Sequence, residues 1–175
     1  MKIKIIAALS LDGIIGENQG LVWHIPEDLE FYKKETTDKV LIVGRKTYES
    51  LPKVALENRR FIILTKENTN YTAVRQWADK YFNSKEEIFN YIKENKLDEI
   101  YVIGGEQIYE LFIGDADEVL ITWINRMISD QPKNWKYFPT TDLFENFELI
   151  EDQDWQESKK EGLPKYKFSR YKKIK

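Results

Sequence analysis

The 175-residue chain contains no cysteine and one histidine, His24. Without cysteine it can form no disulfide bond, and it has no thiolate to act as a nucleophile or metal ligand. A single histidine excludes a histidine cluster for a metal ion, and a Ser-His-Asp triad would have to use His24. We therefore expect no metal site. Any proton chemistry should rest on a carboxylate, a tyrosine, a lysine or a cofactor.

A strong charge imbalance and long apolar runs are also missing. The chain has 27 Lys and Arg residues against 30 Asp and Glu residues, a formal charge of −3, which argues against a nucleic-acid-binding protein. No apolar run reaches the roughly 18 residues of a membrane span. Ser10 and Asp12 interrupt the first apolar run, so we expect a strand and a loop there rather than a signal peptide. These features predict a cytoplasmic protein with no membrane partner.

Hydrophobic residues make up 42% of the chain and aromatic residues 14%, which is too apolar for a disordered protein. The runs predicted as strands are 3–9, 40–43, 61–64, 100–103, 119–124, 147–151 and 166–171. Helices are predicted from Pro26, at 45–51, after Ser84 and at 107–112, and a loop at 125–139. This order indicates one α/β domain over residues 1–175, with a mostly parallel sheet and an antiparallel C-terminal end.

Three predicted strands end in residues that suit a ligand, and ligands bind beyond the carboxyl ends of strands in open α/β sheets. Residues 44–47 combine a glycine, two cations and a hydroxyl at a helix start, which favours an anion. Gly104 and Gly105 allow backbone to approach a ligand closely, and Thr65 and Lys66 add a hydroxyl and a cation. Each feature alone also fits a solvated turn. Together they predict a phosphate-rich ligand such as a dinucleotide.

Asp28 is the candidate functional acid. It lies in the first turn of the helix that Pro26 begins, where an acid commonly serves only as a partner of the helix dipole. Leu29 and Tyr32 lie on the same helical face, which indicates that Asp28 faces inward. A buried carboxyl group must be hydrogen-bonded or neutralised, and its pKa can be raised. Such a group suits a ligand with adjacent N–H donors.

Four segments together resemble the dihydrofolate reductase family: IAALSLDGIIG at 6–16, WHIPEDL at 23–29, VGRKTYES at 43–50 and VIGG at 102–105. Their order and spacing match from residue 2 to about residue 124, and 137–139 are the best anchor beyond. The resemblance implies an eight-stranded, mostly parallel sheet with an antiparallel C-terminal strand and four flanking helices. It also implies NADPH-dependent reduction of 7,8-dihydrofolate to tetrahydrofolate for one-carbon and thymidylate metabolism, with dihydrofolate and antifolates as ligands.

The resemblance also implies residue roles. The carboxylate of Asp28 would bind the pterin 2-amino group and N3, Thr122 would hydrogen-bond that carboxylate, and Trp23 would hold a bridging water. A hydride would reach pterin C6 and a proton N5, the proton by way of water because Asp28 lies too far from N5 in the family. Tyr109 would support the nicotinamide side. The implied catalytic residues are Leu21, Trp23, Asp28, Tyr109 and Thr122.

Two larger sets would bind the ligands, with Arg59 on the glutamate carboxylate and Arg45 and Lys66 on the 2′-phosphate. The implied substrate-binding residues are Ile6, Ala8, Asp28, Leu29, Tyr32, Ser50, Leu51, Leu56, Arg59, Ile103 and Thr122. The implied cofactor-binding residues are Ala8, Ile15, Gly16, Asn18, Gly20, Leu21, Gly44, Arg45, Lys46, Thr47, Leu64, Thr65, Lys66, Ile103, Gly104, Gly105, Glu106, Gln107, Ile108 and Tyr109. The family also holds the Gly104–Gly105 peptide bond in cis. Residues 16–22 would form a lid, which leaves His24 beside the lid with no catalytic role.

Three departures from the family pattern carry predictions. Val22 replaces the usual proline before Trp23, which puts the stiffness of the lid in doubt. Asn58 stands where the family has glycine before Arg59, and asparagine can adopt the positive φ that glycine would have. Residues 134–136 replace a Gly-Asp-Thr segment, and without its acid we expect the coupling of this loop to the lid to be lost.

Two other functions stay open at this point. A related pyrimidine reductase of riboflavin synthesis shares the fold, but residues 23–29 and Arg59 argue against it. The second alternative is a non-catalytic folate- or nucleotide-binding module. Asp28, Thr122 and the glycine pair argue against this alternative. The oligomeric state is open between a monomer, which we expect, and a homodimer.

Overall fold

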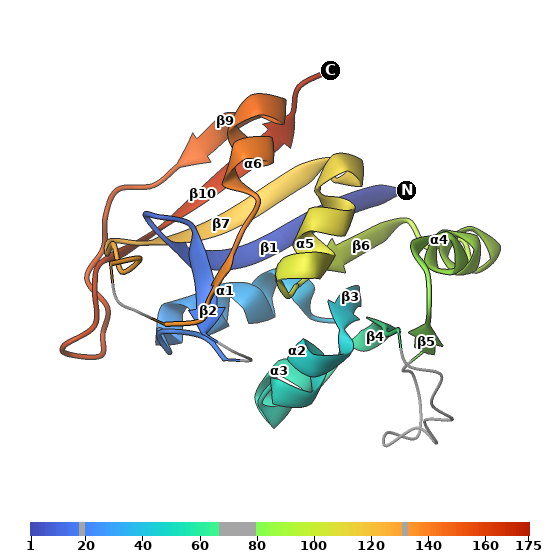
Figure 1. Ribbon diagram of the computed structural model, residues 1–175, viewed down its shortest axis with the longest axis horizontal. Coiled ribbons are helices and arrows are strands. Elements are labelled where there is room, and N and C mark those ends of the chain that lie inside the picture. Colours follow the sequence, from blue (N-terminus) through green and yellow to red (C-terminus); the bar gives the residue numbers. More distant parts are fainter. Residues whose placement is uncertain (18–19, 67–79, 131–132) are drawn as a thin grey trace.

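The computed structural model describes residues 1–17, 20–66, 80–130 and 133–175 (Figure 1). Eight strands form one sheet in the order β5-β4-β3-β6-β1-β7-β10-β9. They are β1 (Lys2–Ser10), β3 (Val40–Gly44), β4 (Arg60–Leu64), β5 (Lys80–Phe82), β6 (Glu99–Val102), β7 (Glu118–Ile124), β9 (Phe147–Asp152) and β10 (Tyr166–Lys173). Strand pairs from β5 to β7 are parallel, and β10 runs antiparallel to both β7 and β9. The predicted fold class is confirmed.

The helices are more numerous than predicted. Among the described residues there are six α-helices and one short 3-10 helix, where the family resemblance implied four helices. They are α1 (Pro26–Thr36), α2 (Arg45–Ser50), α3 (Lys53–Leu56), α4 (Lys85–Glu94), α5 (Glu106–Phe112), α6 (Thr140–Asn146) and the 3-10 helix at Ile113–Asp115. The unexpected α3 and α6 have four and seven residues, too few for a helical pattern to stand out.

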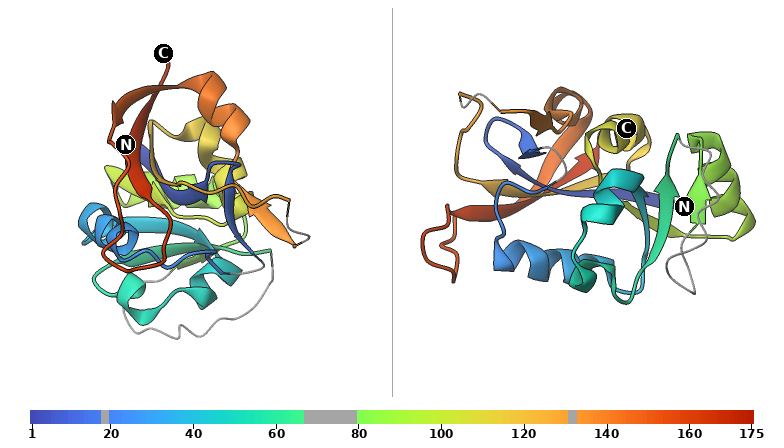
Figure 2. Two further views of the ribbon diagram at one scale, coloured as in Figure 1. Left: turned by 90° about the vertical axis from the view of Figure 1, so that its left-hand side faces the viewer. Right: turned by 60° about the horizontal axis from the view of Figure 1, so that its bottom comes forward.

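The sheet is buried on both faces because its strands alternate between two cores. One core contains Ile5, Ile42 and Val102, and α4, α5 and α6 cover it with residues such as Ile88 and Phe112. The other takes the alternate strand positions, and α1, α2 and α3 cover it. Figure 2 shows α1, α2 and α3 on one side of the sheet and α5 and α6 on the other. Continuous apolar runs such as 40–43 reflect this burial on two sides.

A second, small sheet pairs β2 (Ile14–Glu17) with β8 (Trp135–Tyr137) in antiparallel fashion. The prediction of a loop throughout 125–139 is therefore wrong at β8. A strand of three residues has no readable period, and its partner lies near the other end of the chain. The pairing therefore leaves no local signal in the sequence.

Local signals explain where two helices begin. Pro26 occupies the first turn of α1, and Glu27 and Asp28 follow it where the helix dipole favours acids. In α4 the Ser84 hydroxyl accepts the backbone N–H of Glu87, as the predicted capping pattern requires. None of the helices in the described segments is long and apolar enough to cross a membrane.

Candidate active site

Asp28 lies in a pocket at the carboxyl ends of β1 and β7. Residues of β1, β2, α1, β7 and the segment between β2 and α1 line it, and Asp28 alone among them is ionisable. The lining residues are Ala8, Leu9, Ile14, Ile15, Leu21, Val22, Trp23, Ile25, Asp28 and Ile124. The structure thus brings together five predicted site residues, from three sequence segments, around one carboxyl group.

The environment of Asp28 is unusual for a carboxylate. Burial raises the pKa of its carboxyl group to about 6, and the neighbouring Thr122 hydroxyl lowers it by less. Thr122 is fully buried on β7, and within the described residues its hydroxyl oxygen has no hydrogen-bond partner. An unpaired buried hydroxyl beside a buried carboxyl group is costly to leave without a ligand. The carboxyl group of Asp28 lines the pocket and is available to a ligand with N–H donors.

Tyr109 has a structural role beside the pocket and is not a proton donor. Its hydroxyl donates a hydrogen bond of 2.9 Å to the carbonyl of Ile6, which joins α5 to β1. Burial, together with the negative charge of Asp28, raises the pKa of this phenol far above its usual value. The hydroxyl therefore stays protonated and keeps α5 hydrogen-bonded to β1.

The remaining predicted substrate residues gather on the α1 to α3 side of the sheet. Ile6, Leu56 and Ile103 are buried in one cluster, and Tyr32 and Leu51 pack against it. The hydroxyl of Tyr32 on α1 donates to the carbonyl of Ala55 on α3 at 2.9 Å, so the two helices are tied across the cleft. Leu29 is half-buried, whereas Ser50 is exposed and its hydroxyl bonds the Thr47 carbonyl.

Arg59 is held at the end of α1. Its Nε donates to the Thr36 hydroxyl at 2.7 Å, and its guanidinium lies 4.9 Å from the centre of the Tyr32 ring. Further donations go to the carbonyls of Glu57 and Lys33. Asn58 before it has a φ of 56°, which confirms the expectation that asparagine takes the place of glycine here.

The glycine-rich ends of β3 and β6 lie side by side. The backbone N–H of Gly44 donates to the carbonyl of Gly104 at 2.8 Å, and the Gly104–Gly105 peptide bond is cis, as predicted. Gly104 has a φ of +104°, and a Cβ there would lie 2.8 Å from the Tyr109 ring. A Cβ on Gly105 would lie 2.9 Å from the Thr47 hydroxyl. Only glycine fits both positions, so the two loops reach the same place at the sheet edge.

Cations surround these loops. Arg45 forms an ion pair of 3.0 Å with Glu49, and Lys46 and Lys66 are exposed. The other predicted cofactor residues are spread around the loops and the lid. Leu64, Thr65 and Ile108 are buried or half-buried, and Gln107 is exposed. The Gly20 carbonyl lies close to Gly16, and Asn18 lies outside the described residues. His24 is exposed and is not among the residues that line the pocket.

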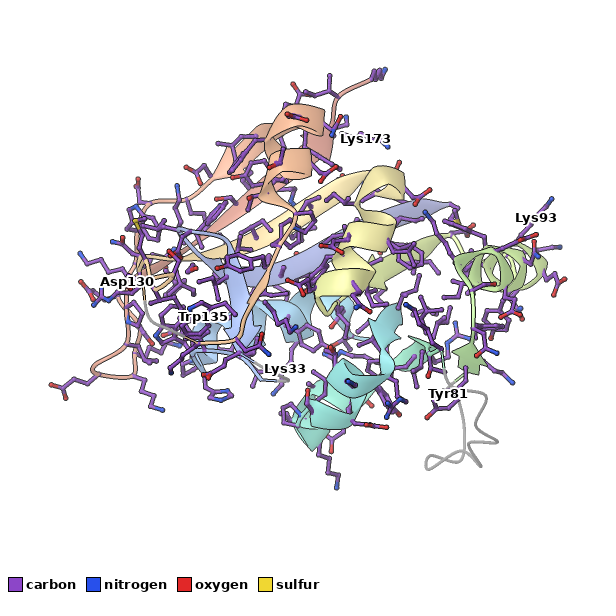
Figure 3. All side chains as sticks on the ribbon, in the orientation of Figure 1. Lys33, Tyr81, Lys93, Asp130, Trp135 and Lys173 are labelled. Carbon is purple, nitrogen blue, oxygen red and sulfur yellow. The ribbon has the colours of Figure 1, made fainter. Side chains whose placement is uncertain are left out.

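Residues 134–136 pair directly with the start of the lid, since Gly16 lies opposite Lys136 and Glu17 opposite Trp135, so the expected loss of this coupling is wrong. The Asp12 carboxylate accepts the backbone N–H groups of Ile128 and Ser129, each at 2.8 Å. Trp135 on β8, labelled in Figure 3, packs with Ile128 against Trp23. Asp12, which precedes the lid, thus holds the segment between β7 and β8.

Sequence reasoning also missed Glu27, which is 7% exposed. Its carboxylate accepts the hydroxyl of Ser158 at 2.9 Å and the backbone N–H of Lys159 at 2.6 Å. These contacts join residues more than 130 positions apart. No local pattern signals such a pair.

Comparisons with known proteins agree with this geometry. The family model described as "Dihydrofolate reductase" matches residues 2–173. The dihydrofolate reductase of Buchnera aphidicola subsp. Baizongia pistaciae is 36% identical over 146 residues, which is 81% of this chain and 80% of that protein. The dihydrofolate reductase of Enterococcus faecium is 31% identical over 163 residues, 93% of this chain and 92% of that protein. A solved Enterococcus faecalis dihydrofolate reductase, complexed with NADP(H) and RAB-propyl, aligns with a TM-score of 0.77 and 25% identity, covering 99% of this chain and 97% of that one.

Proposed function

This chain belongs to the dihydrofolate reductase family, and we propose that it reduces 7,8-dihydrofolate to 5,6,7,8-tetrahydrofolate with NADPH. The observation that carries the proposal is Asp28. Among the described residues that line the pocket at the carboxyl ends of β1 and β7, it alone is ionisable, and the buried Thr122 hydroxyl lies beside it. The product would serve one-carbon and thymidylate metabolism.

The loops after β3, β4 and β6 fit a dinucleotide with a phosphate on its ribose. Backbone N–H groups at the starts of α2 and α5, which lack side-chain caps, suit a diphosphate, and Gly44 and Gly104 bring these two helix starts together. Arg45 and Lys66 would hold the 2′-phosphate, which favours NADPH over NADH. When bound, NADPH supplies a hydride to C6 of the pterin.

Asp28 and its neighbours handle the substrate. The carboxylate accepts hydrogen bonds from the pterin 2-amino group and N3, adjacent N–H donors that match its two oxygens. Its pKa near 6 keeps it mostly ionised at neutral pH, so it polarises the pterin. The proton for N5 comes from water, because the Tyr109 hydroxyl is committed to the Ile6 carbonyl. Leu21 and Trp23, at the pocket wall, limit how much water enters.

At the other end of the cleft, Arg59 binds the carboxylate of the substrate tail. Its guanidinium is already fixed by Thr36 and by the Tyr32 ring, so little side-chain freedom is lost on binding. The cluster of Ile6, Leu56 and Ile103 gives the middle of the substrate an apolar wall.

The decisive experiment follows NADPH absorbance in the presence of dihydrofolate, with wild-type protein and the Asp28→Asn variant. We expect wild-type turnover that an antifolate inhibits, and a decrease of about 100-fold or more in the variant at neutral pH, since Asn cannot carry the charge. Wild-type protein that oxidises no NADPH would contradict the proposed reaction. Near-wild-type turnover of Asp28→Asn would contradict the role of Asp28.

We also propose that residues 1–175 act as one domain and as a monomer in the cytoplasm. The family match over 2–173 supports the single domain. Light scattering on the purified protein tests the monomer, and a mass of twice 20.9 kDa would contradict it.

A further inference from the structure

The connection between β9 and β10, residues 153–165, reaches back to the helix that carries Asp28. It leaves the sheet after Asp152 and returns at Tyr166, where Gln156 and Tyr166 exchange backbone hydrogen bonds of 2.8 and 3.0 Å. The carbonyl of Lys165 accepts the N–H of Asn125 at 2.8 Å, just beyond the end of β7. Beyond these anchoring bonds, Ser158 and Lys159 reach the first turn of α1.

At that turn, Glu27 holds the connection. Its side chain is buried, and its two carboxylate oxygens accept one donor each, from Ser158 and Lys159. The Ser158 hydroxyl in turn accepts the N–H of Lys160 at 3.2 Å, and the Lys159 ammonium lies 3.9 Å from Glu30 on the next turn of α1. A buried carboxylate is costly unless it is hydrogen-bonded, so these contacts stabilise Glu27 in its position against the connection.

Within the part of the chain that the structure describes, the N-cap position of α1 has no side-chain capping hydrogen bond. The residue before Pro26 is Ile25, which has no side-chain hydrogen bond to offer to the free N–H groups of the first turn. Glu27 places a negative charge there, next in sequence to Asp28. The position of the first turn therefore depends on the Glu27 contacts.

The same connection supports the pocket wall. Ile25 and Ile124 line the pocket with Asp28, and both pack on Tyr166 at the end of the connection. Leu163, from within the connection, packs against this cluster together with Trp23. Residues 153–166 therefore contact both the helix turn that carries Asp28 and the apolar residues around it.

We propose that Glu27, with Ser158 and Lys159, forms a clamp that positions Asp28 for the substrate, which makes Glu27 a positioning residue of the reaction proposed above. The clamp touches the pterin side of the pocket and not the loops at Gly44 and Gly104. Its loss should weaken the binding of dihydrofolate and leave the binding of NADPH unchanged.

The experiment compares Glu27→Ala, Glu27→Gln and Ser158→Ala with Ser169→Ala as the matched control. Ser169 is buried on β10 and bonds Asp152, so its loss destabilises the same strand pair without touching α1. We expect Glu27→Ala to raise the Kd and KM for dihydrofolate about tenfold, with the NADPH values within about twofold. Glu27→Gln, which retains one acceptor, and Ser158→Ala should show smaller changes in the same direction. Ser169→Ala should lower the melting temperature and change neither affinity.

The outcomes separate the clamp from the proposed reaction, because dihydrofolate binding is measured directly by calorimetry as well as by turnover. Glu27→Ala that melts earlier but keeps the wild-type dihydrofolate affinity would overturn the clamp and leave the reaction intact. Equal losses for both ligands, as a general structural defect would give, would overturn it too. Wild-type protein that binds dihydrofolate without turnover would contradict only the reaction, and the Kd values would still decide the clamp.

Discussion

At the scale of single residues, Asp28 sets function against stability. A carboxylate that is charged inside a pocket costs folding free energy, since burial raises its pKa from 3.8 to about 6. Relative to the unfolded chain, the folded protein therefore favours the protonated form of Asp28. The ionised form, which attracts N–H donors, lowers the stability of the fold. Without a ligand the buried carboxylate lacks partners that would fully offset its desolvation. A ligand with N–H donors supplies those partners and so gains binding free energy.

This conflict predicts that Asp28→Asn is more stable than the wild type at high pH. The contribution of Asp28 is fully present below its unfolded pKa and is lost as the pH rises through about 6. The variant should match the wild type near pH 4 and exceed it by up to about 3 kcal/mol above pH 7, by urea unfolding. The same stability difference at both pH values would contradict this.

At the scale of elements, the carboxyl ends of β1, β3, β4, β6 and β7 supply the proposed site. Each strand delivers a short loop rather than a large structure, and β3 and β6 are close enough for Gly44 to bond Gly104. Because parallel strands end at one edge, segments far apart in sequence reach the same ligand. Cofactor choice should therefore depend on loop side chains, and not on the sheet.

The preference for NADPH over NADH tests whether side chains beyond the strand ends, and not the sheet, choose the cofactor. Arg45→Ala and Lys66→Ala each remove a cation that lies just after the end of a strand, at the start of α2 and beyond β4 respectively. Each should reduce the preference for NADPH over NADH by about tenfold, and the pair by more, because only NADPH carries the 2′-phosphate. The ratio of kcat/KM for the two cofactors measures it. The exposed Lys53→Ala, on α3, is the control and should leave the ratio unchanged.

The contact of Asp12 with the segment between β7 and β8 gives a second prediction at this scale. Hydrogen bonds from Ser10, Ile128 and Ser129 outweigh burial and lower the pKa of Asp12 to about 2. Its contribution is present above the unfolded pKa of 3.8 and is lost as the pH falls through about 2. Asp12→Asn should cost about 1–3 kcal/mol at pH 7 and progressively less in acid, by thermal unfolding between these pH values. A cost that stays constant down to pH 2 would show that the charge of Asp12 is not involved.

At the scale of the whole molecule, a network of charges joins elements at the opposite end of the strands from Asp28. Arg170 on β10 lies within 3.3 to 3.5 Å of carboxylate oxygens of Glu35, Glu118 and Glu151. These acids come from α1, β7 and β9, so one guanidinium connects four elements. Arginine suits this place because its fork of donors stays charged and reaches several acceptors.

Arg170→Ala should therefore lower the unfolding free energy by about 1–3 kcal/mol, since Glu35 and Glu118 are mostly buried and lose a partner. Turnover at a temperature where the variant stays folded should not change, because the network is remote from the pocket. Lys53→Ala, which breaks an exposed pair with Glu57, is the control and should cost less than about 1 kcal/mol. Equal losses in both variants would contradict the network.

The sequence by itself determined the features that depend on neighbours along the chain. Apolar runs marked the long strands, Pro26 and Ser84 marked helix starts, and Asn58 could be assigned a positive φ. The inward direction of Asp28 also followed, because Leu29 and Tyr32 share its helical face. The ligands, however, came from the family resemblance and not from these patterns.

Only the tertiary structure decided which distant segments meet. The pairing of β2 with β8, the contacts of Asp12 with Ile128, and the clamp of Glu27 on Ser158 each join residues more than 100 positions apart. A hydrogen bond needs atoms within about 3 Å, and no periodicity along the chain encodes a distance between two loops. For the same reason the sequence identified Asp28, but only the folded chain showed that residues 153–165 contact the helix that carries it.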